Sequence, residues 1–66
     1  MLEIVLNGEK KKTASASLAA LLEELQFSGQ RCATMVNGAV VRRTERDKQP
    51  LHPNDAVEII TMVGGG

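Results

Sequence analysis

The stretch LEIVLNG, residues 2–8, decides how the fold begins. Its first five residues place an apolar side chain at every second position, a period of two that is typical of a strand with one face against a core. The last two residues, Asn7-Gly8, tolerate the positive φ angles of a tight hairpin turn. The polar residues 9–13 then return as a second strand, so the sequence predicts an N-terminal β-hairpin.

Three consecutive lysines, residues 10–12, lie in this second strand. Lysines on a strand are typical of a sheet edge, where their charge discourages pairing with another sheet. The chain also carries 8 basic and 8 acidic residues, and Phe27 is its only aromatic side chain for stacking on a base. We therefore expect neither a nucleic-acid partner nor binding to an anionic membrane.

Leucines recur at helical spacing after the hairpin: Leu18, Leu21, Leu22 and Leu25. Positions i, i+3, i+4 and i+7 share one face of a helix, and Ser15 or Ser17 supplies the N-cap. Ser28-Gly29 is the predicted end, in the manner of a glycine stop. The pattern predicts one amphipathic helix whose leucine stripe packs on the sheet.

The second half of the chain repeats the strand and turn signals. Residues 32–36 form a mixed apolar stretch that predicts a third strand, and Asn37-Gly38 marks another hairpin turn before a short strand at 40–41. Residues 42–49 are charged and lack an apolar period. We expect this segment to form one helical turn that crosses the surface without packing on the core.

The last strand is the most strand-like run in the sequence. Residues 50–55 contain both prolines of the chain and predict a turn. Residues 56–63 follow, rich in valine and isoleucine, and predict a long final strand.

Length and composition exclude several functional classes. A chain of 66 residues can build one core but rarely spares the volume of a deep pocket, and no catalytic triad or phosphate-binding glycine loop can be assembled from it. No apolar run approaches the roughly 20 residues that span a bilayer, and no signal peptide is recognisable. We therefore expect a cytoplasmic monomer that is not itself an enzyme.

Two isolated residues of reactive type have simple structural explanations. Cys32 is the only cysteine, so it fits a half-buried strand position in a reducing compartment better than a nucleophile or persulfide site. His52 has no second His or Cys at ligand spacing, so a metal site there lacks ligands and we interpret it as a turn residue.

The predicted order of elements is similar to the ubiquitin-like β-grasp fold, an α+β class with a mixed four- to five-stranded sheet packed on one main α-helix. More narrowly, the chain resembles the ThiS family of sulfur carriers in LEIVLNG (2–8), LAALLEEL (18–25), VNG (36–38), DAVEI (55–59) and the closing VGGG. The sequence departs from that pattern at Pro53-Asn54-Asp55, where Asp-Gly-Asp is usual, and in a third terminal glycine. The resemblance implies a β-grasp domain over residues 1–63 and a flexible glycine tail over 64–66.

The resemblance also implies the chemistry. The carboxylate of Gly66 would be adenylated by an ATP-using ThiF-like enzyme and converted to a thiocarboxylate by a sulfur donor. A ThiG-like thiazole synthase would then take the sulfur for the thiazole ring of thiamin. The chain would bind no cofactor of its own, and ATP would belong to the partner. Gly64 and Gly65 lack side chains and could thread in extended form into a partner's active site.

A docking surface follows from strand alternation. If the alternate residues of the first and last strands face the helix, then Val5, Ile60 and Met62 lie on the opposite face of the sheet. An apolar cluster beside the tail is a plausible docking patch, although single exposed hydrophobic residues are also ordinary in small proteins.

Two other functions fit the same residues. Carriers for molybdopterin synthesis, cysteine synthesis or tRNA thiolation share the fold and the glycine tail. A noncatalytic interaction module would work through the sheet alone, because three terminal glycines also fit a frayed chain end.

Overall fold

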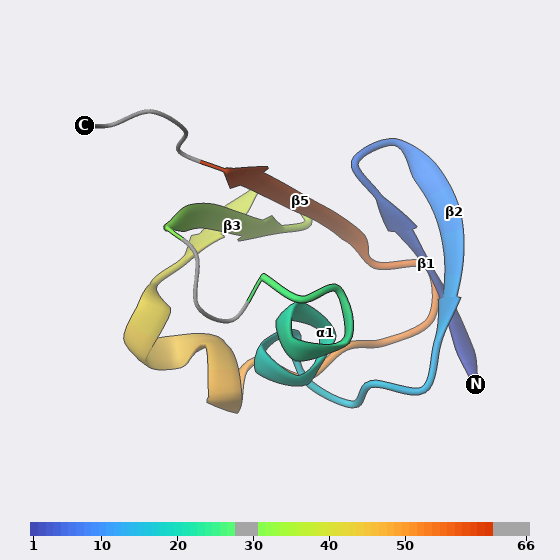
Figure 1. Cartoon of the computed structure of the whole chain (residues 1–66). Helices are drawn as coiled ribbons and strands as arrows, with labels where there is room; N and C mark the ends of the chain where they lie inside the picture. Colours follow the sequence, from blue (N-terminus) through green and yellow to red (C-terminus); the bar gives the residue numbers. More distant parts are fainter. Residues whose placement is uncertain (28–30, 62–66) are drawn as a thin grey trace.

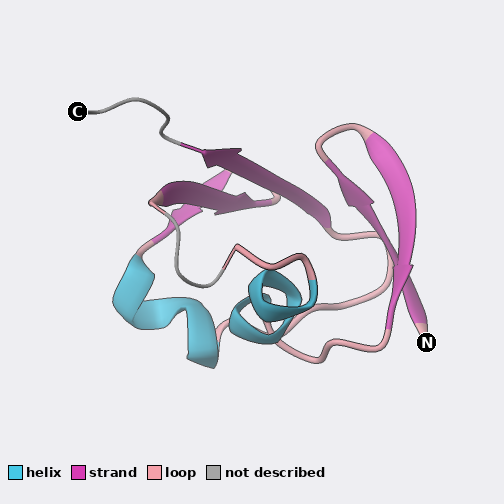
Figure 2. Cartoon of the chain, viewed as in Figure 1, coloured by secondary structure: helices cyan, strands magenta, loops and turns pink. Residues whose placement is uncertain are grey.

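The computed structural model describes residues 1–27 and 31–61, and in this part of the chain a five-stranded sheet packs on one α-helix (Figure 1). The elements are β1 (Leu2–Leu6), β2 (Glu9–Thr13), α1 (Leu18–Glu24), β3 (Cys32–Val36), β4 (Ala39–Val41), the 3₁₀-helix η1 (Arg43–Lys48) and β5 (Ala56–Thr61). Figure 2 shows both helices on the same side of the sheet. The predicted α+β class and β-grasp arrangement are confirmed, with five strands in the sheet.

The strand that comes last in the sequence lies at the centre of the sheet. The spatial order is β2-β1-β5-β3-β4. β5 runs parallel to β1, with Val5 beside Ala56, and antiparallel to β3. The two hairpins therefore flank β5, and the lysine-rich β2 forms one edge of the sheet as its sequence predicts.

The core lies between α1 and the sheet face turned toward it, which we call the inner face. The buried apolar side chains among the described residues are Ile4, Leu18, Leu21, Leu22, Val36, Val41, Leu51, Val57 and Ile59. Each buried leucine contributes about 1.5–3 kcal/mol of transfer free energy before chain entropy is subtracted. Leu25 and Cys32 are partly buried against this cluster. The predicted leucine stripe and the half-buried strand cysteine are therefore confirmed.

Ser17 caps the start of α1. Its backbone is extended, and its hydroxyl oxygen accepts a hydrogen bond from the N–H of Ala20 at 3.1 Å. Of the two serines that the sequence offers, this is the one that satisfies a donor of the first helical turn.

The end of α1 differs from the prediction. The helix ends at Glu24 instead of at Ser28-Gly29, and the left-handed position after it is taken by Gln26, with φ +64°. The N–H of Phe27 donates to the carbonyl of Leu22 (2.7 Å) and the N–H of Gln26 to that of Glu23 (3.1 Å), the two bonds of a Schellman motif. Phe27 packs against the core beyond this turn. The helix therefore stops in a Schellman turn whose left-handed residue is Gln26, with the apolar contact of Phe27 beyond it.

The charged segment after β4 crosses the surface without a buried residue, as predicted, but hydrogen bonds join it to the sheet. Residues 43–48 form η1 beside α1, which makes the segment longer than the single turn predicted (Figure 1). Arg46 donates from Nε to Oγ1 of Thr34 (3.1 Å) and from Nη2 to the carbonyl of Cys32 (2.6 Å). One arginine of this exposed run thus ties η1 to β3, a contact that the sequence pattern alone does not predict.

Glycine at position 26 should stabilise the domain. A residue with a Cβ strains in the left-handed region, so we expect Gln26→Gly to raise the free energy of unfolding by about 0.5 to 1 kcal/mol. The matched control Glu23→Gly, at an exposed position in the last turn of α1, should lower it by up to about 1 kcal/mol. Urea titration measures both, and a loss of stability in Gln26→Gly would contradict the Schellman assignment.

Candidate functional site

The side chain of Asn7 holds β5 from the β1 side. Asn7 has φ +48° in the first hairpin turn, and its backbone N–H donates to the carbonyl of Val57 at 2.9 Å. Its Oδ1 accepts from the N–H of Ile59 (2.8 Å), and its Nδ2 donates to the carbonyl of the same residue (3.2 Å). The carboxamide therefore behaves as an additional peptide group, which extends the pairing of β5 beyond the end of β1.

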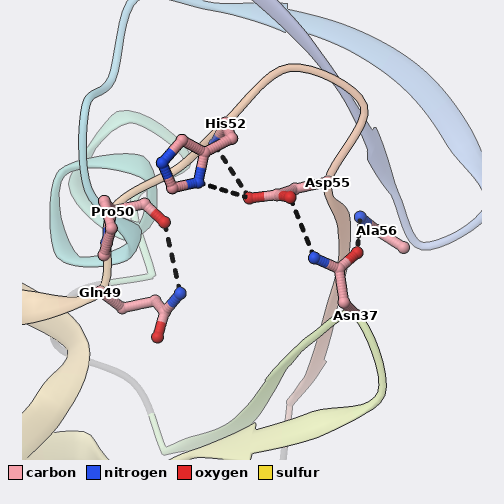
Figure 3. A network of polar contacts seen from close by, with 6 residues as sticks. All are labelled: Asn37, Gln49, Pro50, His52, Asp55 and Ala56. Atoms are coloured by element: carbon pink, nitrogen blue, oxygen red, sulfur yellow. Dashed lines mark hydrogen bonds and ion pairs between the residues drawn. The ribbon is translucent and has the colours of Figure 1, made fainter.

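Asn37, in the second hairpin turn, does the same from the β3 side (Figure 3). It has φ +51°, and its backbone N–H donates to the carbonyl of Ala56 at 2.7 Å. Its Oδ1 accepts from the N–H of Ala56 (2.9 Å), while its Nδ2 donates to Oδ1 of Asp55 (2.9 Å). Both Asn-Gly pairs that the sequence marks as turns therefore also fix the strand that leads toward the glycines.

Asp55 organises the turn before β5. It is 9% exposed, and its second oxygen accepts from the backbone N–H of His52 at 2.9 Å. Nδ1 of His52 lies 3.8 Å from the same oxygen, and the imidazole is mostly exposed, so the prediction of a turn histidine is confirmed. Below it, Nε2 of Gln49 donates to the carbonyl of Pro50 (3.3 Å; Figure 3).

In the turn before β5, Asn54 takes the place of the glycine in the usual Asp-Gly-Asp turn. Asn54 takes the left-handed conformation (φ +70°) that a glycine would adopt there, and asparagine tolerates this region better than most residues. Its N–H donates to the carbonyl of Glu3 at 2.7 Å. The turn therefore joins β1 without a glycine.

A second polar network lies away from β5, between β2 and the end of α1. Glu24 accepts hydrogen bonds from the hydroxyls of Thr13 and Ser15, and Lys11 lies 3.3 Å from its other oxygen. The hydrogen bond from Thr13 has the largest effect on the pKa of Glu24, followed by the bond from Ser15 and then by Lys11. Together they hold this pKa below its ordinary value. The network joins β2 to α1, so we assign it a structural role.

The face of the sheet turned away from α1, which we call the outer face, carries the predicted docking residues. Ile60 is 55% exposed and Val5 is half-buried; both line an open depression. Val5 pairs with Ala56, four residues before Ile60, so the two side chains lie roughly 13 Å apart along β5 with Glu58 between them. Met62, the third predicted member, lies outside the described residues.

Three apolar residues on the other side of β5 were missing from the predicted patch. Ala33 pairs with Ile60, and Met35 pairs with both Glu58 and Val40. Val40 is 71% exposed. Alternation in the third strand, with the register of the Asn37-Gly38 turn, was a signal that could have placed these side chains on the outer face.

Gly66, which is expected to carry the chemistry, lies outside the described part of the chain, as do Gly64 and Gly65, which are expected to thread into a partner. Over residues 1–27 and 31–61, no group of three His, Cys, Asp or Glu side chains is arranged to hold a metal ion. No helix in these same ranges is long and apolar enough to cross a membrane.

Comparison with known proteins gives consistent matches over the whole chain. The sequence model of the ThiS family matches residues 4–66. A thiazole synthase of Paramagnetospirillum magneticum is 30% identical over 66 residues, which cover 98% of this chain but only 20% of that protein. The uncharacterized protein ycf40 of Pyropia yezoensis is 35% identical, with 98% of this chain and 93% of that protein covered. The crystal structure of the thiamine biosynthesis protein ThiS from Geobacter metallireducens aligns with a TM-score of 0.81 at 26% identity, covering 98% of this chain and all 100% of the other.

The two faces of the sheet should respond differently to a charge. Ile60→Glu places its carboxylate in solvent on the outer face, so we expect stability to change by no more than about 0.5 kcal/mol. Leu22→Glu buries a carboxylate in the core and should unfold the domain. Circular dichroism with thermal melting compares the two variants. Equal loss of structure in both would show that the side chain at position 60 is not free in solvent.

Proposed function

Because the chain belongs to the ThiS family, whose members are small sulfur carriers of thiamin biosynthesis, we propose that the carboxylate of Gly66 carries the sulfur. The family match that extends through Gly66 is the observation that carries this proposal. The position of β5 supports it, because the strand that precedes residues 62–66 is the central strand of the sheet and is bonded from both sides by asparagine side chains.

The chemistry starts from an unreactive group. A terminal α-carboxyl has an unperturbed pKa of about 3.3 to 3.7, so at neutral pH it is an anion that nucleophiles do not attack. In the proposed reaction its oxygen attacks the α-phosphorus of ATP on a ThiF-like adenylating enzyme, and pyrophosphate leaves. A sulfur donor then attacks the acyl carbon and displaces AMP, which leaves a thiocarboxylate on Gly66. The catalytic groups belong to the partners, so the chain acts as a protein co-substrate.

The tail residues have a separate role in this proposal. Gly64 and Gly65 present no side chain, so the extended backbone can enter a channel too narrow for any other residue. In this proposal the partner binds the domain of residues 1–63, and residues 64–66 enter the partner's active site.

The partner that removes the sulfur is proposed to be a ThiG-like thiazole synthase. A stretch similar to this chain makes up 20% of the thiazole synthase of Paramagnetospirillum magneticum. In that protein a sequence of this kind and the rest of the synthase therefore occur in one polypeptide. This fusion supports a thiazole synthase as the acceptor of the sulfur, in preference to the enzymes of molybdopterin synthesis, cysteine synthesis or tRNA thiolation. The reduced state that suits Cys32 favours a cytoplasmic setting.

The outer face is the proposed docking surface for these partners. Ile60 and Val40 expose large apolar side chains there, and Val5 lines the same depression as Ile60. The proposed patch of Val5, Ile60 and Met62 is thereby extended toward β3 and β4. The same exposed face also favours the rival function, a noncatalytic interaction module, which would need the sheet but not the glycines.

Substitutions in the tail test carrier against module. With a cognate adenylating enzyme, Gly65→Val should lower ATP–pyrophosphate exchange by about 100-fold, since small displacements in an active site cost that much, while the melting temperature stays unchanged. Gly65→Ala is the matched control and should fall between the wild type and the valine variant. Normal exchange by Gly65→Val would contradict threading.

Deletion of Gly65 and Gly66 separates the two functions more completely. A carrier loses all sulfur transfer while it still binds its partner through the outer face. If the truncated chain retained biological activity, the module would be the correct function. Ile60→Glu in the full-length chain is the complementary variant, because it should weaken docking and leave the tail intact.

A further inference from the structure

The two hairpin turns share a chemical liability. Each is an Asn-Gly pair with both residues at positive φ: Asn7 and Gly8, Asn37 and Gly38. Glycine places no side chain beside its backbone nitrogen, so that nitrogen can reach the side-chain carbonyl carbon of the preceding asparagine more easily than in any other pair. The product of that attack is a cyclic imide, which water opens.

We propose that Asn37-Gly38 is a deamidation site that strand β5 holds in check, and that its reaction loosens the turn from which β5 begins. The backbone nitrogen of Gly38 forms a bond to Cγ of Asn37 and gives up its proton, and the Cγ–Nδ2 bond breaks to release ammonia. Water then adds to either carbonyl of the succinimide, which yields aspartate or isoaspartate. Water is the only reagent consumed.

The contacts of Asn37 explain why the folded chain resists this reaction. Its Oδ1 accepts from Ala56 N–H and its Nδ2 donates to Asp55, both at 2.9 Å. The carboxamide must leave both partners to turn toward the nitrogen of Gly38. Two hydrogen bonds lost before the reaction should slow it on the order of tenfold or more relative to the unfolded chain. Gly38 itself has nothing within 4 Å of the position of an added Cβ, so water can reach the turn.

The product conflicts with its surroundings. An aspartate at position 37 still accepts from Ala56, but its second oxygen replaces a donor and faces the carboxylate of Asp55. Asp55 is 9% exposed and already uses its other oxygen for the N–H of His52, so it cannot easily turn away. Two carboxylates held this close repel each other. Isoaspartate adds a backbone carbon and moves Cγ from the side chain into the backbone, so the side-chain oxygen that accepts from the N–H of Ala56 leaves its position.

The other turn provides an internal comparison. At Asn7 the group facing Nδ2 is the carbonyl of Ile59, at 3.2 Å, which is neutral. Deamidation there also replaces a donor with an acceptor, but the new carboxylate then faces a neutral carbonyl and not a second carboxylate. Asn7→Asp should therefore cost less stability than Asn37→Asp.

Peptide mapping by mass spectrometry tests the protection. The full chain is incubated at mildly alkaline pH, once folded and once in urea at matched pH, and conversion of each Asn-Gly peptide is followed over time. We expect conversion at position 37 in urea and at least a tenfold lower rate in the folded chain. Equal rates in the two conditions, or no conversion in urea, would overturn the proposal.

An exchange of the side chains at positions 37 and 55 tests whether the charge conflict lowers stability. Asn37→Asp should lower the urea midpoint clearly, whereas the double variant Asn37→Asp with Asp55→Asn should recover most of the loss. In the double variant an amide at position 55 donates to a carboxylate at position 37, which still accepts from Ala56. If Asn37→Asp fails to fold, recovery of a folded chain in the double variant still shows that the charge conflict was the cause. Additive losses in the double variant, or a harmless Asn37→Asp, would refute the charge conflict.

Discussion

Two asparagine carboxamides hold the central strand, and the rest of the structure depends on that constraint. Asn7 bonds both the N–H and the carbonyl of Ile59, although the two residues are 52 positions apart in sequence. Asn37 bonds Ala56 and the buried carboxylate of Asp55 from the opposite side. Insertion of the last strand between two hairpins closes long loops, an entropic cost that only contacts specific to that strand can offset.

This arrangement connects the fold to the proposed function. A carrier that offers its tail to several partners needs a rigid domain immediately before the tail. β5 supplies it, because its inner residues Val57 and Ile59 lie in the core while Ile60 remains exposed on the outer face. The same strand therefore belongs to the core, to the proposed docking surface and to the lead into the glycines. Polar contacts that link α1 and η1 to the sheet, through Glu24 and Arg46, keep the opposite layer in place.

Local patterns in the sequence were sufficient for most of the fold. Period-two alternation in residues 2–6 and the two Asn-Gly pairs predicted strands and turns that the structure confirms. The helix end was mispredicted because Gly29 is the obvious stop signal in the sequence, whereas the contact of Phe27 with the core depends on tertiary packing. The bonds from η1 to β3 could not be predicted for the same reason, since the acceptors of Arg46 lie in a strand distant in sequence.

The candidate site could be predicted only in part. Alternation correctly placed Val5 and Ile60 on the face opposite the helix, but it could not give the four-residue offset between them, which follows from the pairing of Val5 with Ala56. Nor could a turn signal reveal that the asparagine side chains bond a strand far along the chain. The chemistry assigned to Gly66 came from the family resemblance, because three glycines carry no side-chain pattern from which to argue.

The most direct test of the carrier function is intact mass spectrometry of a chain that ends at Gly66, after incubation with ATP, a cognate adenylating enzyme and a sulfide source. We predict a gain equal to the replacement of one oxygen by sulfur, confined to the C-terminal peptide and dependent on ATP. An unchanged mass in the presence of an adenylating enzyme that is active on its own carrier would contradict the account.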